Sequence, residues 1–134
     1  MANTIDLTIV TPDGKKLCDE ARIVNCMTTA GAIGILPNHS PLVGIIPISH
    51  LNYKKVEDEK MESIDIAIAG GVIDVKDNSV IVLADAFETK DEIDRNRAEE
   101  AKRRAEERIA SNDPNIDVKR AELALSRALS RLSL

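Results

Sequence analysis

Residues Glu92–Ala110 read EIDRNRAEEAKRRAEERIA, and the chain changes its structural pattern at this stretch. Its few apolar side chains recur at Ala98, Ala101, Ala105 and Ile109. Spacings of three and four residues place them along one face of a helix. Most of the other positions are charged, as on the solvent-facing side of such a helix. The stretch therefore predicts a helix with a narrow, mostly alanine stripe.

Before Glu88 the apolar residues follow a different period, in which they alternate with polar ones. The clearest runs are Ile5-Leu7-Ile9, Ile64-Ile66-Ile68 and Val80-Val82. Turn-forming residues separate such runs at Pro12-Asp13-Gly14, Pro37-Asn38 and Gly70-Gly71. Many short strands joined by tight turns predict an antiparallel β-sandwich or flattened barrel, which we place at residues 1–87.

After the first helix, the sequence predicts a break and a second helix. Ser111–Asn115 is rich in turn residues, and Asp113 before Pro114 suits an N-cap followed by the first helical position. A second apolar stripe follows at Val118, Ala121, Leu125, Ala128 and Leu132. Residues 88–134 are therefore predicted to form two antiparallel helices joined by a short loop. The fold class is α+β in two parts, a sandwich followed by an αα-hairpin.

Composition excludes several classes of function. The net charge is −5, and one Tyr, one Phe and no Trp are present, so nucleic-acid binding is not expected. The sequence has no apolar run of about 20 residues and no signal-peptide pattern at its start. We expect a cytoplasmic protein in which Cys18 and Cys26 are buried thiols, although strand positions leave a disulfide between them open.

The second predicted helix carries an excess of basic charge. Residues 116–134 hold four basic side chains, Lys119, Arg120, Arg127 and Arg131, against the acids Asp117 and Glu122. This excess fits either an acidic partner or an ordinary solvated face. An alanine seam also buries little apolar area, so the hairpin is predicted to be marginally held and movable. A static hairpin packed on the sandwich is the alternative.

Three arginines are predicted to converge in the hairpin. Arg127 and Arg131 lie four residues apart with no acid at helical spacing to neutralise them. Folding the hairpin about Asp113 places Arg97 between them, and guanidinium groups bind phosphate oxygens well. Asp94, one turn before Arg97, is suited to accept a hydrogen bond from the amino group of a base. The sequence thus suggests a nucleotide site, unless these side chains simply face solvent or a partner.

Five segments occur in one particular order: IVTPDG, GAIGILPNHSPLV, AGGVIDV, VIVLADAFE and KRAELALSRALSRL. Because of these five segments and their order, the chain resembles the epsilon subunit of bacterial F-type ATP synthase over essentially its whole length. The resemblance implies a ten-stranded β-sandwich followed by an αα-hairpin, in agreement with the periodicity. Two loop positions depart from the family pattern, since Ala32 replaces an acidic or polar residue and Asn38 replaces a glycine. We expect Asn38 to tolerate the glycine conformation and His39 to be a structural turn residue.

The segment Ile93-Asp94-Arg95-Asn96-Arg97-Ala98 resembles the (I/L)-D-x-x-R-A motif of this family, which supplies an ATP site in some members. The resemblance implies that Ile93 and Ala98 flank the base and that Asp94 faces its amino group. It further implies phosphate contacts from Arg97, Arg127 and Arg131, with Glu88 and Arg104 in the same site. ATP, alone or with Mg²⁺, would be a regulatory ligand that is not hydrolysed, and no structural metal is expected.

The resemblance also implies a role in a complex. The chain would be a non-catalytic subunit of the central stalk, with the sandwich bound to the gamma subunit and the c-ring. The hairpin would switch from a compact to an extended state, in which its second helix reaches the alpha and beta subunits and inhibits ATP hydrolysis. ATP would favour the compact state. The complex would hold the chain peripherally at the cytoplasmic face of the bacterial cell membrane.

The sequence lacks the motifs of common enzymes. No GxxxxGK[ST], GxSxG or HExxH pattern occurs, and the two histidines lack metal-ligand spacing. Gly70-Gly71 is therefore predicted to be a strand bend. Two other hypotheses are a generic interaction module whose hairpin binds a partner helix without any nucleotide, and a small enzyme with a cleft between sandwich and hairpin.

Overall fold

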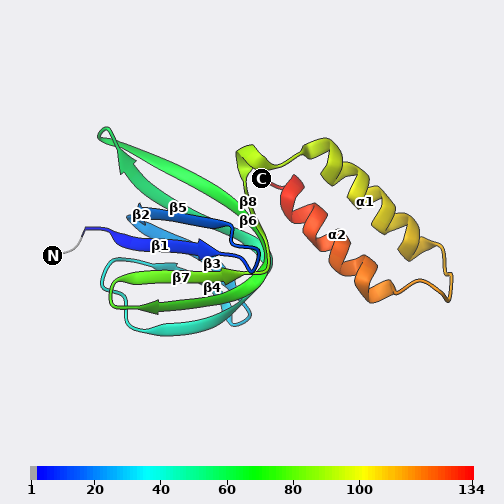
Figure 1. Ribbon diagram of the computed structural model, residues 1–134, viewed down its shortest axis with the longest axis horizontal. Coiled ribbons are helices and arrows are strands. Elements are labelled where there is room, and N and C mark those ends of the chain that lie inside the picture. Colours follow the sequence, from blue (N-terminus) through cyan, green and yellow to red (C-terminus); the bar gives the residue numbers. More distant parts are fainter. Residues whose placement is uncertain (1–2) are drawn as a thin grey trace.

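The computed structural model describes residues 3–134, so residues 1–2 of the predicted sandwich lie outside the described part (Figure 1). The strands are β1 Ile5–Val10, β2 Lys16–Ala21, β3 Ile23–Thr28, β4 Gly31–Ile35, β5 Leu42–Glu57, β6 Lys60–Lys76, β7 Ser79–Ala84 and β8 Phe87–Thr89. A 3-10 turn, η1 Lys90–Glu92, leads to α1 Arg95–Ala110 and α2 Val118–Leu132. The predicted β-sandwich followed by a helical hairpin is confirmed.

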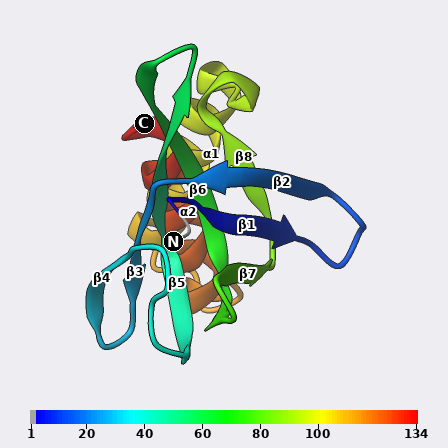
Figure 2. The same ribbon diagram turned by 90° about the vertical axis from the view of Figure 1, so that its left-hand side faces the viewer.

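Two long strands, β5 and β6, run through both layers of the sandwich (Figures 1 and 2). Residues Ile66–Ile68 of β6 pair with β8, whereas Gly71–Lys76 pair with β7. The change of partner falls at Gly70-Gly71, which confirms the predicted strand bend. Eight strands, with β5 and β6 counted once in each layer, match the ten that the resemblance implies.

The sheet is not wholly antiparallel. Its order is β2-β1-β7-β6-β5-β3-β4, and β1 pairs with β7 in parallel, with Leu7 opposite Val80 and Ile9 opposite Val82. All other pairs are antiparallel. The alternation of apolar residues is the same in both kinds of pair, so it does not predict strand direction.

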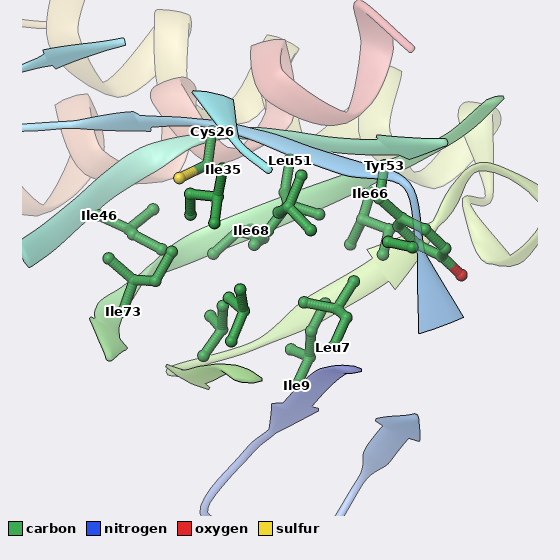
Figure 3. Close-up of a cluster of buried hydrophobic side chains, with 14 of the residues drawn as sticks. Leu7, Ile9, Cys26, Ile35, Ile46, Leu51, Tyr53, Ile66, Ile68 and Ile73 are labelled. Atoms are coloured by element: carbon green, nitrogen blue, oxygen red, sulfur yellow. The ribbon is translucent and has the colours of Figure 1, made fainter. Parts of the chain in front are cut away.

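The core lies between the two layers and is almost entirely aliphatic (Figure 3). Ile5, Leu7 and Ile9 of β1 are buried, as their alternation with polar residues predicts. They meet side chains such as Leu51 and Ile66 from the long strands. Tyr53 enters from the rim and donates its hydroxyl to Asp19 Oδ2 at 2.8 Å.

The two cysteines differ in their surroundings, and both are free thiols. Cys26 is buried, and this burial raises the pKa of its thiol to about 11. The predicted burial of Cys18 is wrong, because this residue is exposed on the edge strand β2 beside Thr8 of β1. Successive side chains of a strand point to opposite faces of the sheet, and Cys18 lies on the outer face, between the half-buried Leu17 and Asp19.

Left-handed backbone conformations occur at the predicted turns. Asn38 has φ 64°, which confirms that asparagine serves where a glycine was expected. His39 donates its backbone N–H to Leu36 C=O at 3.2 Å and so lies within the turn. The Asn78 side chain joins this loop to the N-terminal segment, since it accepts from Asn38 N–H at 2.9 Å and donates to Thr4 C=O at 2.8 Å.

The hairpin has the predicted alanine seam. The buried residues of α1 and α2 are Ala98, Ala105, Ala121 and Ala128. Val118, predicted on the stripe, is the first residue of α2 and is 45% exposed.

The predicted N-cap of the second helix is wrong. Asp113 instead closes a turn, in which its Oδ1 accepts from Asn115 N–H at 2.9 Å and its C=O from Ile116 N–H. Asp117 caps α2, accepting from Arg120 N–H at 3.1 Å. The loop is therefore longer than expected, and Pro114 belongs to it.

Gly71 should be the least replaceable glycine of the sandwich. A Cβ there would lie 2.3 Å from Leu83 C=O, whereas a Cβ at Gly34 would meet the movable Asn25 side chain at 3.1 Å. We expect Gly71→Ala to lower the free energy of unfolding by about 3 kcal/mol and Gly34→Ala by less than about 1 kcal/mol. Urea denaturation of both variants measures this, and equal losses would contradict the close approach.

Candidate functional site

A cleft of about 530 Å³ lies where the start of α1 and the end of α2 meet β8 and the connector that follows it. Its lining comprises Glu88, Glu92, Asp94, Arg97, Ala98, Ala101, Arg104, Ala124, Arg127 and Arg131. The volume lies within the range of pockets that hold nucleotide-sized ligands. The alanines leave room between the helices, while the charged side chains surround it.

The antiparallel course of the helices places the charged residues of the cleft at one end. Asp94 begins α1 by accepting a hydrogen bond from Arg97 N–H at 3.1 Å. Arg95, the first residue of α1, donates from Nη2 to Leu132 C=O of α2 at 2.9 Å. This hydrogen bond ties the start of α1 to the end of α2. As a result, Arg97 of the first helix and Arg127 of the second line the same cleft.

Each carboxylate of the cleft has a partner of its own. Glu88 Oε1 accepts from Arg131 Nε at 2.9 Å, and Asp94 caps α1. Glu92 lies 2.6 Å from Lys15 Nζ, a residue of the β1–β2 turn. The hydrogen bond from Lys15 lowers the pKa of the Glu92 carboxyl, so this pair stays ionised at neutral pH.

The other arginines of the cleft are not neutralised. Arg97, Arg104 and Arg127 form no ion pair within residues 3–134. Three unpaired guanidinium groups around one cleft favour a polyanion such as a triphosphate. Among the described residues, no group of three or more His, Cys, Asp or Glu side chains is placed to hold a metal ion.

Most of the predicted site residues come together in this cleft. Glu88, Asp94, Arg97, Ala98, Arg104, Arg127 and Arg131 all line it. Ile93 does not, because it ends η1 in an extended conformation and is half-buried in the connector.

Sequence reasoning missed Glu92, Ala101, Ala124 and the supporting Lys15. Thr89-x-x-Glu92 has the spacing of a capping box, and Thr89 N–H and Oγ1 both donate to Glu92, so that signal was available. Nothing in the sequence indicates that Lys15 approaches Glu92.

A second groove, of about 720 Å³, lies on β3, β4 and β5. It is larger than the hairpin cleft, but neither lysine nor arginine lines it; its walls include Asn25, Met27, Gly34 and Asn52. Because size alone does not bind phosphate, the charge of the hairpin cleft makes it the better anion site.

Comparison with known families agrees with this two-part architecture. A family model described as "ATP synthase, Delta/Epsilon chain, beta-sandwich domain" matches residues 4–90. A second, "ATP synthase, Delta/Epsilon chain, long alpha-helix domain", matches residues 91–134. The two matches meet between residues 90 and 91, just after β8. The division predicted from the sequence, between residues 87 and 88, falls inside this strand.

Similar proteins match over nearly their whole lengths. The ATP synthase epsilon chain of Ligilactobacillus salivarius is 44% identical over 133 residues, covering 97% of this chain and 94% of the relative. That of Bacillus licheniformis is 40% identical over 131 residues, covering 98% of this chain and 97% of the relative.

Solved structures share the fold. A chain in the Euglena gracilis mitochondrial ATP synthase, OSCP/F1/c-ring, superposes with a TM-score of 0.80 at 22% identity, over 99% of this chain and 81% of that one. A chain in the central stalk and c-ring of the Tetrahymena thermophila mitochondrial enzyme gives 0.54 at 17% identity, over 96% and 91%.

The sandwich and the hairpin, each matched by its own family model, thus define a two-part subunit of an ATP synthase. The chain belongs to the ATP synthase delta/epsilon chain family. Its resemblance to epsilon chains, predicted from the sequence, is confirmed by the relatives. None of the helices in residues 3–134 has both the length and the apolar character needed to cross a membrane.

Asp94 should have a structural role that is separable from any ligand contact. We expect Asp94→Ala to destabilise α1 by about 1 kcal/mol through loss of the N-cap, and Asp94→Asn to cost only a few tenths of a kcal/mol. Thermal unfolding followed by the helical circular dichroism signal measures this, with exposed Asp91→Ala as the control. Equal destabilisation by both Asp94 variants would contradict the capping role.

Proposed function

We propose that this chain is the regulatory epsilon subunit of the ATP synthase central stalk and that ATP in the hairpin cleft holds the hairpin against the sandwich. The observation that carries the proposal is the trio Arg97, Arg104 and Arg127, unpaired around a nucleotide-sized cleft. The cleft draws on β8, the connector and both helices, so it exists only while the hairpin is docked. A ligand that contacts all four favours the docked form by its differential affinity.

The chemistry of the cleft supports sensing of ATP and not its hydrolysis. Glu88 and Glu92 are each paired with a cation, which disfavours their use as a base toward water. Asp94 Oδ1 is used by the cap, which leaves Oδ2 for the amino group of adenine. If Mg²⁺ accompanies the nucleotide, the phosphate oxygens themselves are its best ligands in this arginine-rich cleft.

An exposed apolar face supports assembly through the sandwich. Ile45, Val72 and Leu83 lie side by side across β5, β6 and β7 and are 60%, 39% and 58% exposed. Apolar rows of this kind mark protein interfaces. We assign the sandwich to the gamma subunit and the c-ring, an assignment supported by the fold shared with chains in c-ring assemblies. The complex would place the chain peripherally on the cytoplasmic face of the bacterial membrane.

The second helix supports the inhibitory role. Leu123 and Leu129 are 45% and 46% exposed on α2, beside its basic residues. In an extended hairpin this amphipathic surface would contact the alpha and beta subunits and block ATP hydrolysis. The thin alanine seam makes separation of the two helices from each other inexpensive, as an extended hairpin requires.

Calorimetric titration with ATP tests the sensing role. We expect Arg97→Ala to weaken binding at least about tenfold, because a charge-assisted phosphate contact is lost. Arg103→Ala is the matched control, since Arg103 faces away from the cleft and pairs with Glu107 at 3.6 Å. The absence of heat up to millimolar ATP, or equal effects of both substitutions, would favour the interaction module without a nucleotide site.

Removal of residues 91–134 tests the inhibitory role. In the assembled ATP synthase we expect this truncation to increase ATP hydrolysis several-fold while ATP synthesis continues. The sandwich keeps its own core, which contains no helical residue, so assembly should be unaffected. Unchanged hydrolysis by a complex that retains the truncated chain would refute inhibition by the hairpin.

A further inference from the structure

Lys15, in the turn between β1 and β2, holds the segment that joins the sandwich to the hairpin. Its Nζ donates to Phe87 C=O, at the start of β8, at 2.8 Å and lies 2.6 Å from Glu92 Oε2. The ammonium group also lies 4.5 Å from the centroid of the Phe87 ring, within the range of a cation–π contact. One side chain therefore contacts both ends of residues 87–92, where the chain passes from the last strand to the first helix.

The backbone of the turn fixes the position of Lys15. Thr11 N–H donates to Lys15 C=O at 3.0 Å, and Lys15 N–H donates to Thr11 Oγ1 at 3.1 Å. Gly14, with φ 93°, takes the left-handed conformation that the tight turn requires. Because Thr11 is buried, the turn is anchored in the sandwich. Lys15 therefore reaches the connector from a fixed base that belongs to the sandwich and not to the hairpin.

Glu92 differs from the other carboxylates of the cleft in where its cation comes from. Glu88 is paired with Arg131, which itself lines the cleft, and Asp94 caps α1. Glu92 also lines the cleft, but its cation is Lys15, which does not. Within residues 3–134, Glu92 is thus the one cleft carboxylate that is neutralised from outside the cleft.

Lys15 and Thr89 together occupy both oxygens of the Glu92 carboxylate. Oε1 accepts from Thr89 N–H at 3.3 Å and from Thr89 Oγ1 at 2.9 Å, and Oε2 accepts from Lys15. Without the lysine, Oε2 would lose its partner and become available to the three unpaired guanidinium groups of the same cleft. A carboxylate tethered beside them has an effective concentration of about millimolar or more. It would therefore compete with phosphate oxygens for the arginines.

We propose that Lys15 is a positioning residue for the hairpin cleft, in which it withholds the Glu92 carboxylate from the three unpaired arginines. This inference rests on the proposed function, because it takes the cleft to be the site of the nucleotide phosphates. Lys15 has no contact with the cleft of its own, so its effect passes through Glu92. The side chains of the pair are 37% and 43% exposed, so the fold should survive the loss of this ion pair.

Calorimetric titration of the full chain with ATP tests this role. We expect Lys15→Met to weaken binding about three- to tenfold, because Glu92 then occupies part of the arginine cluster. Lys15→Arg keeps the positive charge and should bind ATP within about twofold of the parent chain. Lys16→Met is the matched control, since it removes the same charge from an adjacent exposed residue that forms no ion pair within residues 3–134.

A double-mutant cycle separates this role from a purely structural one. In a Glu92→Gln background, which has no carboxylate to withhold, Lys15→Met should change the affinity by less than about twofold. A structural role of Lys15 at Phe87 C=O would persist in that background. The proposal is overturned if Lys15→Met weakens binding equally in both backgrounds or has no more effect than Lys16→Met. Binding by Lys15→Arg as weak as by Lys15→Met also overturns it.

The Nε–H signals of the arginines, measured by NMR without nucleotide, give a second readout. In Lys15→Met the signal of Arg97, Arg104 or Arg127 should shift as Glu92 pairs with it, and Lys15→Met/Glu92→Gln should reverse the shift. If the signals respond in this way but the parent chain does not bind ATP, the role of Lys15 is supported and ATP sensing is contradicted. If ATP binds and neither readout responds to Lys15→Met, only the role of Lys15 is contradicted. Unchanged signals together with no binding contradict both.

Discussion

The docking of the final turn of α2 onto the sandwich is the interaction on which the site depends. Ser130 and Arg131 contact β5 and β8 there, and Arg95 joins the same helix end to α1. Without this junction, Arg127 and Arg131 would have no fixed position relative to the connector. The seam between the helices offers only alanines, so it holds the pair together without anchoring it to anything else. The cleft is therefore as stable as this one docking contact.

The same arrangement couples binding of an anion in the cleft to docking of the hairpin. Its carboxylates are satisfied inside the docked chain, whereas three of its guanidinium groups remain unpaired. A docked hairpin without a ligand thus holds like charges close together, which opposes docking. An anion in the cleft removes that repulsion. The docking contacts of α2 stabilise the docked hairpin, whereas repulsion among the unpaired arginines destabilises it. A bound anion shifts this equilibrium toward the docked form.

The two-part fold and most of the candidate site could be predicted from the sequence, because both depend on local patterns of residues. Period two predicted the sandwich, period 3.6 predicted the hairpin, and the antiparallel fold-back placed Arg97 near Arg127 and Arg131. Features that depend on distant pairing were not accessible. The parallel pairing of β1 with β7 and the approach of Lys15 to Glu92 join segments far apart in the chain. The exposure of Cys18 depends on which face of β2 the rest of the sandwich covers. The N-cap of α2 was misplaced because two aspartates precede it, and only the folded loop selects Asp117.

The order of residues along the chain determines when the docking contact can form during protein synthesis. The sandwich is complete at Thr89, whereas the residues that anchor the hairpin to it, Ser130 and Arg131, lie in the last turn of α2, near the end of the sequence. Chains fold from the N-terminus as they leave the ribosome. The sandwich is therefore free to fold, and to meet its partners, before the anchoring turn has been translated. Every newly made chain passes through an undocked state first.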